Sequence, residues 1–206
     1  IFNQTFQDFE IVLFDGVSTD DTIDILKSYK DPRLRWISEP DSDANEGFYK
    51  ALIKTRGEYV MCMCISDGYV DMDWFRKCAE VLDDDINISL VYANLYNIDS
   101  NGKRVLSIPD WVNNPPPSSK EFFLFWLAKR SVIPELTYCV RSTVFKKFFP
   151  VIKNVIFNFE NPPDPVTDDY FQTHCPWYKF EYNFIKSGYL PKYLPFAPVY
   201  SRLHND

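Results

Sequence analysis

The chain has 206 residues, 46% of them hydrophobic and 25% charged, which fits one mid-sized globular domain and excludes a disordered chain. Its formal net charge of −7 at pH 7 supplies no basic stripe, so we expect no nucleic acid partner. The five cysteines form no CxxC pair and the longest apolar run, residues 59–65, is far too short for a bilayer span, so we predict a reduced, cytoplasmic protein.

The first elements in the chain alternate between strand and helix patterns. Residues 10–14 are almost continuously apolar, as in a strand that is buried on both faces. Ser18 and Asp21 resemble a capping box, and the helix that follows ends before Asp31. Residues 34–37 then predict a second strand, and residues 45–56 predict a second helix.

The alternation continues to about residue 106. Residues 59–65 predict a third strand, Asp73 is placed to cap a third helix, and residues 88–98 predict a fourth strand before a hairpin turn at residues 100–102. Four strands that alternate with helices predict an α/β fold with a mostly parallel sheet and helices on both faces.

The pattern changes in the second half. Prolines mark loops at residues 115–117 and 162–165, and residues 120–128 predict a short aromatic helix. We expect residues 107–206 to belong to the same single domain as residues 1–106, without a core of their own.

Two carboxylates follow buried strands, where ligands bind in open α/β sheets. Asp15 ends the first strand, and Asp67 stands in Ser66-Asp67-Gly68 after the third. A carboxylate at the first position can accept hydrogen bonds from a base, and one at the second can hold a divalent cation. The alternatives are helix capping around Ser18 and an ordinary Asp-Gly turn.

The order and separation of these segments resemble family 2 glycosyltransferases of the GT-A fold, which is Rossmann-like. The resemblance rests on residues 3–22, on Ser38-Glu39-Pro40-Asp41-Ser42 and on residues 56–59, and it covers residues 1 to about 100. It implies an enzyme of the hexosyltransferase type that moves a sugar from a nucleotide-diphospho donor to a carbohydrate acceptor with inversion.

The resemblance also implies roles for individual residues in residues 1–106, the half expected to bind the nucleotide-sugar. Asp15 would contact the nucleobase and Asp67 would bind Mg²⁺ or Mn²⁺. The nucleotide-sugar site would comprise Asp15, Gly16, Ser18, Asp41, Lys50 and Asp67.

Two departures from the family pattern leave alternatives open. The acidic motif of the family carries two or three carboxylates, but Cys64 and Ser66 precede Asp67 here. Lys50 remains from an Asn-Lys-Gly motif, as a phosphate contact or as a solvated helix lysine. A degenerate, non-catalytic module that binds a sugar nucleotide or a glycan is therefore the alternative function.

The catalytic base is expected in residues 107–206, the acceptor-side half, because displacement at the anomeric carbon needs a group that deprotonates the acceptor hydroxyl. The candidates are Asp169, Glu181 and Asp168, in that order of preference for the first two. The alternative for the two aspartates is a negatively charged helix N-terminus.

The resemblance further implies partners and a cellular context. The donor would be linked to UDP or GDP, and the acceptor would be a carbohydrate or a lipid-linked glycan in surface polysaccharide or glycoconjugate synthesis. Peripheral association with the inner face of the membrane is compatible with that context. Such enzymes open with a further strand and helix, so we expect the chain to be incomplete at its N-terminus.

Overall fold

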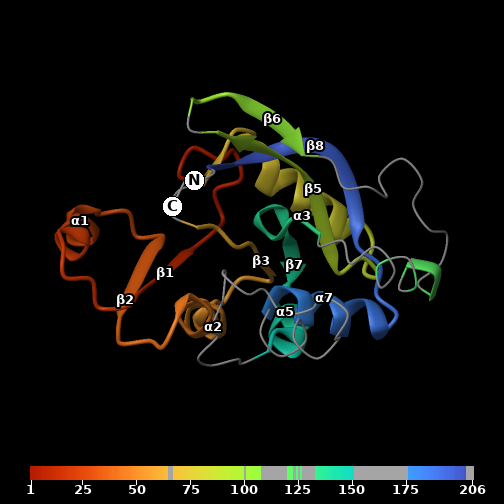
Figure 1. Cartoon of the computed structure of the whole chain (residues 1–206), viewed down its shortest axis with the longest axis horizontal. Coiled ribbons are helices and arrows are strands. Elements are labelled where there is room, and N and C mark those ends of the chain that lie inside the picture. Colours follow the sequence, from red (N-terminus) through yellow and green to blue (C-terminus); the bar gives the residue numbers. More distant parts are fainter. Residues whose placement is uncertain are drawn as a thin grey trace.

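Two strands near the start of the chain pair in parallel in the computed structural model, which describes residues 1–64, 67–99, 101–107, 120–122, 124, 126, 133–150 and 176–202 (Figure 1). β1 (Ile11–Asp15) lies beside β2 (Leu34–Ser38), and α1 (Thr22–Ser28) connects them. Asp15 is opposite Ser38 in the register. The carboxyl ends of both strands therefore meet at one edge, as predicted from the alternation of elements.

The start of α1 differs from the predicted capping box. Asp21 is the N-cap residue, but its side chain makes no capping hydrogen bond. The N–H of Thr22 donates to Asp20 Oδ1 at 3.0 Å instead, and the hydroxyl of Ser18 donates to Asp15. The capping-box prediction is wrong because the buried Asp15 carboxylate takes Ser18, which no longer reaches the helix.

Six further strands form a second, mixed sheet. Their order is β3-β7-β5-β8-β4, with β6 also paired to β5. β5 and β8 are parallel, and the other pairs are antiparallel. The strands are β3 (Tyr59–Val60), β4 (Gly68–Tyr69), β5 (Leu90–Ile98), β6 (Arg104–Ser107), β7 (Cys139–Arg141) and β8 (Lys192–Arg202).

The α/β fold with helices agrees with the prediction, but the expectation of a mostly parallel sheet is wrong. β5 and β6 are joined by a tight turn at Gly102 and therefore pair antiparallel. The other two neighbours of β5, β7 and β8, come from the second half of the chain. The third strand is also shorter than the predicted residues 59–65. It spans only Tyr59–Val60, since its partner β7 is itself only three residues long.

Helices cover both faces of this sheet. They are α2 (Ala44–Lys54), α3 (Trp74–Asp84), α5 (Ser142–Phe148) and α7 (Pro176–Lys186), with a 3₁₀ turn η1 (Glu135–Thr137) before β7. α5 and α7 lie side by side below the sheet (Figure 1). In the described part of the chain, no helix is long and apolar enough to span a membrane.

Side chains that alternate along β5 divide the core into two clusters. Leu90 and Tyr92 join a cluster with α5 and α7, whereas Val91 and Ala93 join one with α3. The larger cluster contains Leu52 of the first half together with residues of α5 and α7, so the two halves of the chain share this core. The division at residue 106 stays a prediction.

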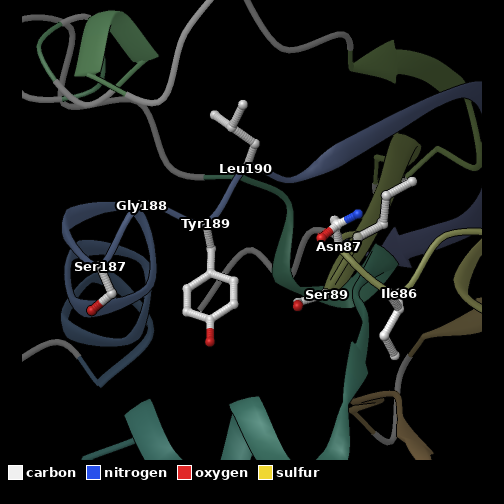
Figure 2. A pocket seen from close by; sticks show the side chains of 8 residues that line it. Ile86, Asn87, Ser89, Ser187, Gly188, Tyr189 and Leu190 are labelled. Carbon is white, nitrogen blue, oxygen red and sulfur yellow. The ribbon is translucent and has the colours of Figure 1, made fainter.

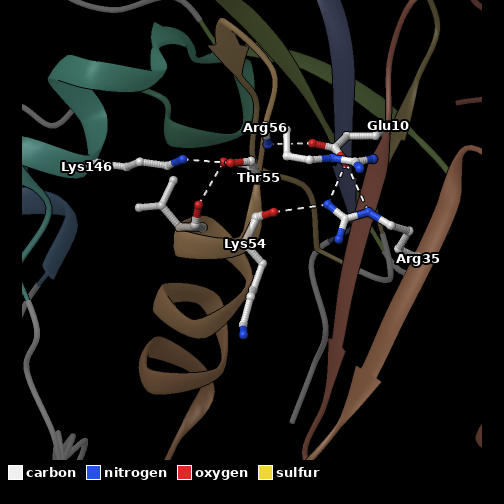
Figure 3. A network of polar contacts seen from close by, with 7 residues as sticks. Glu10, Arg35, Lys54, Thr55, Arg56 and Lys146 are labelled. Carbon is white, nitrogen blue, oxygen red and sulfur yellow. Dashed lines mark hydrogen bonds and ion pairs between the residues drawn. The ribbon is translucent and has the colours of Figure 1, made fainter.

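One carboxylate, Glu10, fastens the parallel pair to the second sheet (Figure 3). Its Oε2 accepts from Arg35 Nη2 at 2.5 Å, and its Oε1 accepts from the Arg56 N–H at 2.5 Å. Arg35 also donates to the carbonyl of Lys54, and Lys146 on α5 donates to the carbonyl of Thr55. Burial raises the pKa of Glu10, but the hydrogen bonds that Glu10 accepts from Arg56 and Arg35 outweigh burial and lower its pKa overall.

We therefore expect Glu10→Gln to lower the free energy of unfolding by about 1–3 kcal/mol, because charge-assisted hydrogen bonds are lost at a partly buried position. Urea denaturation measures the change. The matched control is Asp24→Asn, which removes an exposed ion pair with Lys27 and should change the stability by less than about 0.5 kcal/mol. Equal stabilities of the two variants would contradict this role of Glu10.

Candidate functional site

Asp15 organises the corner between β1 and α1. It is 5% exposed, and its Oδ2 accepts from the N–H groups of Val17 and Ser18, both at 3.1 Å, and from the Ser38 hydroxyl at 2.7 Å. Oδ1 accepts from the Ser18 hydroxyl at 2.5 Å. The hydrogen bonds from Ser18 and Ser38 lower the pKa of Asp15, so the carboxylate is ionised and fixes the loop.

The same loop holds Val17 in a left-handed conformation. Its φ of 67° is the one positive value at a non-glycine residue in the described part of the chain. A β-branched side chain is strained there, since Cβ approaches the following carbonyl oxygen. The hydrogen bond from Val17 N–H to Asp15 keeps it in place.

Asp41 lies against the backbone of this corner. A Cβ added at Gly16 would lie 2.9 Å from Asp41 Oδ2, and one added at Gly47 on α2 would also lie 2.9 Å from that atom. The Asp41 carboxylate therefore fits only because both neighbours are glycines. The structure thus brings together Asp15, Gly16 and Asp41, which the sequence analysis assigned to one site.

Lys50 reaches the loop that carries Asp41. Its Nζ donates to the Pro40 carbonyl at 2.6 Å and lies 3.5 Å from Glu46 Oε1. The lysine is therefore neither fully solvated nor free of protein contacts, and its role as a phosphate contact stays a prediction.

Asp67 lies immediately before β4. Its Oδ1 is buried and has no hydrogen-bond partner among the described residues. An ionised oxygen in that state is costly unless a cation or donor pairs with it. No group of three or more His, Cys, Asp or Glu side chains in the described residues is placed to hold a metal ion. Asp67 alone therefore provides the orphan oxygen that a cation would satisfy.

Glu135, on η1, is a carboxyl group that the sequence analysis did not single out. Burial and the nearby charge of Asp67 raise its pKa, although its own backbone N–H acts in the opposite direction. A carboxylate after Pro134, just before a strand of the second half, was the available signal. Its position in the fold depends on the pairing of β7 with β5, which no local pattern encodes.

The predicted base candidates have different positions. Asp168 and Asp169 lie outside the described residues. Glu181, on α7, is fully buried, and its two oxygens accept from Trp126 Nε1 at 2.8 Å, the Ile133 N–H at 2.9 Å and the Tyr138 hydroxyl. Such surroundings are those of a structural carboxyl group. Its assignment as a base stays a prediction that these contacts do not favour.

A cavity of about 510 Å³ lies elsewhere, between residues 86–89 before β5 and residues 187–190 after α7 (Figure 2). The two segments lie on either side of it in Figure 2. Its lining contains none of the predicted site residues.

Comparison with known proteins gives matches in sequence and in structure. The family model described as glycosyl transferase family 2 matches residues 1–143. A chondroitin synthase from Escherichia coli is 31% identical over 111 residues, which are 53% of this chain and 16% of that protein. A hyaluronan synthase from Pasteurella multocida is 27% identical over 111 residues, 53% of this chain and 11% of that protein. The chain thus spans a small part of these relatives.

Two solved structures share the fold over nearly the whole chain. S. aureus TarS 1–349 in complex with UDP-GlcNAc has a TM-score of 0.63 and 16% identity, covering 99% of this chain and 53% of that one. The mannosyltransferase PcManGT from Pyrobaculum calidifontis, in complex with GDP-Man and Mn²⁺, has a TM-score of 0.60 and 12% identity, covering 99% and 51%. These likenesses confirm the expected GT-A fold.

The buried Glu181 gives a pH-dependent stability. Burial raises its pKa from the ordinary 4.5 to about 8, against hydrogen bonds from Tyr138 and Trp126. The unfolded chain releases this proton near pH 4.5 and the folded chain retains it, so this contribution to stability is full below 4.5 and is lost as the pH rises toward 8. Urea denaturation at pH 5 and pH 8 should show the loss in the wild type, and Glu181→Gln should reduce it by at least about 1 kcal/mol. Glu80→Gln, at an exposed residue, should leave it unchanged; an unchanged slope in Glu181→Gln would contradict the assignment.

The left-handed Val17 gives a prediction of opposite sign. Val17→Gly should raise the free energy of unfolding by up to about 1 kcal/mol, because relief of a strain of about 1–2 kcal/mol exceeds the extra chain entropy of glycine. Val105→Gly is the matched control, since Val105 is also about half-exposed but lies in β6 with ordinary backbone geometry. That control should be destabilised, and a destabilised Val17→Gly would show that the conformation is not strained.

Proposed function

Because the chain belongs to glycosyl transferase family 2, we propose that it transfers a sugar from a nucleotide-diphospho donor to a carbohydrate acceptor, with inversion, in polysaccharide or glycoconjugate synthesis. The sequence relatives described above are a chondroitin synthase and a hyaluronan synthase, and the two structural neighbours are complexes with UDP-GlcNAc and GDP-Man. These names support a donor linked to UDP or GDP. The proposed acceptor is a carbohydrate or a lipid-linked glycan, and peripheral membrane association belongs to the same proposal.

The observation that carries the proposal is the buried Oδ1 of Asp67, which has no hydrogen-bond partner in the described part of the chain and lies just before the edge strand β4. A family 2 enzyme must hold a diphosphate that leaves with negative charge, and this oxygen fits a Mg²⁺ or Mn²⁺ ion that would neutralise it. Diphosphate and water would have to supply the remaining ligands, because Cys64 and Ser66 stand where carboxylates are usual.

The nucleoside would lie at the carboxyl ends of β1 and β2. The Asp41 carboxylate is packed there, with both oxygens close to Gly16 in the loop between β1 and α1. Asp15 already accepts four hydrogen bonds from its own loop and Ser38. We infer that Asp15, with Ser18, acts mainly by shaping the surface on which the nucleobase rests, and that Lys50 positions the Asp41 loop through Pro40.

The donor would occupy residues 1–106 and the acceptor would contact residues 107–206. Attack of the acceptor oxygen on the anomeric carbon breaks the bond from that carbon to the diphosphate, and a carboxylate on the opposite side takes the acceptor proton. Asp168 and Asp169 remain proposed candidates for that base, from outside the described residues.

A degenerate module that binds a sugar nucleotide or a glycan without turnover is the second candidate. One observation favours it: the acidic motif is reduced to Asp67. Such a module would bind the nucleotide but release no sugar.

Calorimetric titration of UDP and GDP, with and without Mn²⁺, tests the proposed donor site. We expect one nucleotide to bind in a Mn²⁺-dependent manner and Asp67→Ala to weaken that binding about 10–100-fold, the loss typical of an interaction with a charged group. Asp24→Ala, on the exposed face of α1, is the matched control and should bind like the wild type. Failure of both nucleotides to bind, with or without the metal, would refute the proposed function.

A further inference from the structure

The cavity between residues 86–89 and residues 187–190 has no part in the donor site proposed above. Its volume of about 510 Å³ is in the range of pockets that bind small molecules, about 300–1,000 Å³. The first segment leads into β5 and the second leads into β8, and Val91 is opposite Lys192 in that parallel pair. The cavity therefore lies at the amino ends of these two strands, whereas the donor is proposed at the carboxyl ends of β1 and β2.

Hydrogen bonds hold both walls of the cavity in place. Arg141 donates from its Nε to the Ile88 carbonyl and from its N–H to the Ser89 carbonyl, both at 2.9 Å. On the other wall, the Gly188 N–H donates to the Ile185 carbonyl at 2.9 Å, and Gly188 turns the chain with a φ of 88°. The cavity is thus formed before a ligand arrives, which reduces the entropy that binding costs.

The hydroxyl groups of Ser89 and Tyr189 belong to the lining and make no hydrogen bond with any described residue. Ser89 is only 3% exposed, and its hydroxyl points toward Tyr189 (Figure 2). The Tyr189 ring is fixed by packing, with its centroid 5.2 Å from that of Phe184 and 5.7 Å from that of Phe148. Both hydroxyls can therefore donate to and accept from a ligand without giving up a bond within the described residues.

The rest of the lining decides the chemistry of that ligand. Asn87 and Ser187 add an amide and a third hydroxyl, and Ile86 and Leu190 add aliphatic surface. Among the described residues, no charged side chain lines the cavity. An ionic ligand would find no ion partner there, and a hydrocarbon chain would leave the hydroxyls unpaired. A neutral sugar offers both hydroxyl groups and apolar C–H faces, and so matches both kinds of lining.

We propose that the cavity binds one sugar of a neutral glycan, an inference that rests on the proposed function for the role of that glycan. Asp67 precedes Gly68, which is opposite Tyr200, and Tyr200 is in turn opposite Tyr96. From Leu90, beside the cavity, to Tyr96 the extended strand covers about 20 Å. The bound sugar is therefore not the one that reacts with the donor. It belongs to a distant part of a long acceptor or product, and the cavity holds that chain on the enzyme.

Ligand-observed NMR and calorimetry on the 206-residue chain test this site, without nucleotide or Mn²⁺. The probes are tetrasaccharides of glucose, mannose and N-acetylglucosamine, and a hyaluronan tetrasaccharide is the charged comparison. We expect a neutral probe to bind more tightly than the charged one. Tyr189→Phe, which keeps the packing of the ring, should weaken binding about 2–10-fold, and addition of Ser89→Ala should bring the loss to about 5–100-fold, as for two neutral hydrogen bonds.

A matched pair of control substitutions is available on the other side of the molecule. Tyr29→Phe with Ser28→Ala removes the same two hydroxyls from exposed positions at the end of α1 and should bind the sugar like the wild type. All variants should keep the wild-type affinity for UDP or GDP. Urea denaturation shows that each variant is folded.

The outcomes separate this site from the proposed donor site. The sugar site is refuted if no neutral probe binds, if the hyaluronan probe binds as tightly as the best neutral one, or if Tyr189→Phe and the double variant bind like the wild type. Displacement of the sugar by UDP or GDP also refutes it, because the sugar then occupies the donor site. A wild type that binds neither nucleotide refutes the proposed function, whereas the sugar titrations still decide on the cavity. Binding of a neutral probe that only the cavity variants weaken supports the proposal.

Discussion

The ion pairs and hydrogen bonds of Glu10 fix how the parallel β1–β2 pair sits against the rest of the molecule. Glu10 precedes β1, Arg35 belongs to β2, and Arg56 follows α2 just before β3. One partly buried carboxylate thus links the start of β1, the strand β2 and the segment between α2 and β3. Lys146 on α5 binds the carbonyl of Thr55 in that same segment. Asp15, Ser18 and Asp41 lie on the parallel pair or its loops, whereas Asp67 and Glu135 lie with the larger sheet. The relative position of these two groups depends on this join.

The carboxyl groups of the molecule show how surroundings divide one chemistry into several roles. Asp15 accepts four hydrogen bonds, stays ionised and acts on its own backbone. Glu181 accepts from three buried groups and holds a proton, so it links α7 to Trp126 and Ile133. Asp67 has a buried oxygen without a hydrogen-bond partner among the described residues, a state that a cation or a donor would stabilise.

Local patterns predicted the elements better than their pairing. The β-α-β unit around Asp15 follows from apolar periodicity and was predictable, whereas the meeting of Asp15 and Asp41 at one edge was implied only by the family resemblance. The neighbours of β5 were not, because β7 and β8 begin 41 and 94 residues after the end of that strand, and only tertiary packing selects them. Glu181 was a reasonable base candidate as a carboxyl group in the second half of the sequence. In the fold it is fully buried and surrounded by hydrogen-bond donors, which the sequence did not indicate.

The packing of Asp41 against two glycines restricts the order in which this corner can change during evolution. The three atoms nearest to a Cβ at position 16 all belong to the Asp41 side chain, whereas a Cβ at position 47 would also meet Phe14 at 3.1 Å. A larger residue at position 16 thus becomes acceptable only after Asp41 has been shortened, and position 47 would remain restricted even then. The effect of a substitution at Gly16 therefore depends on what already occupies position 41. Such epistasis permits loss of the carboxylate first and filling of the glycine second, and opposes the reverse order.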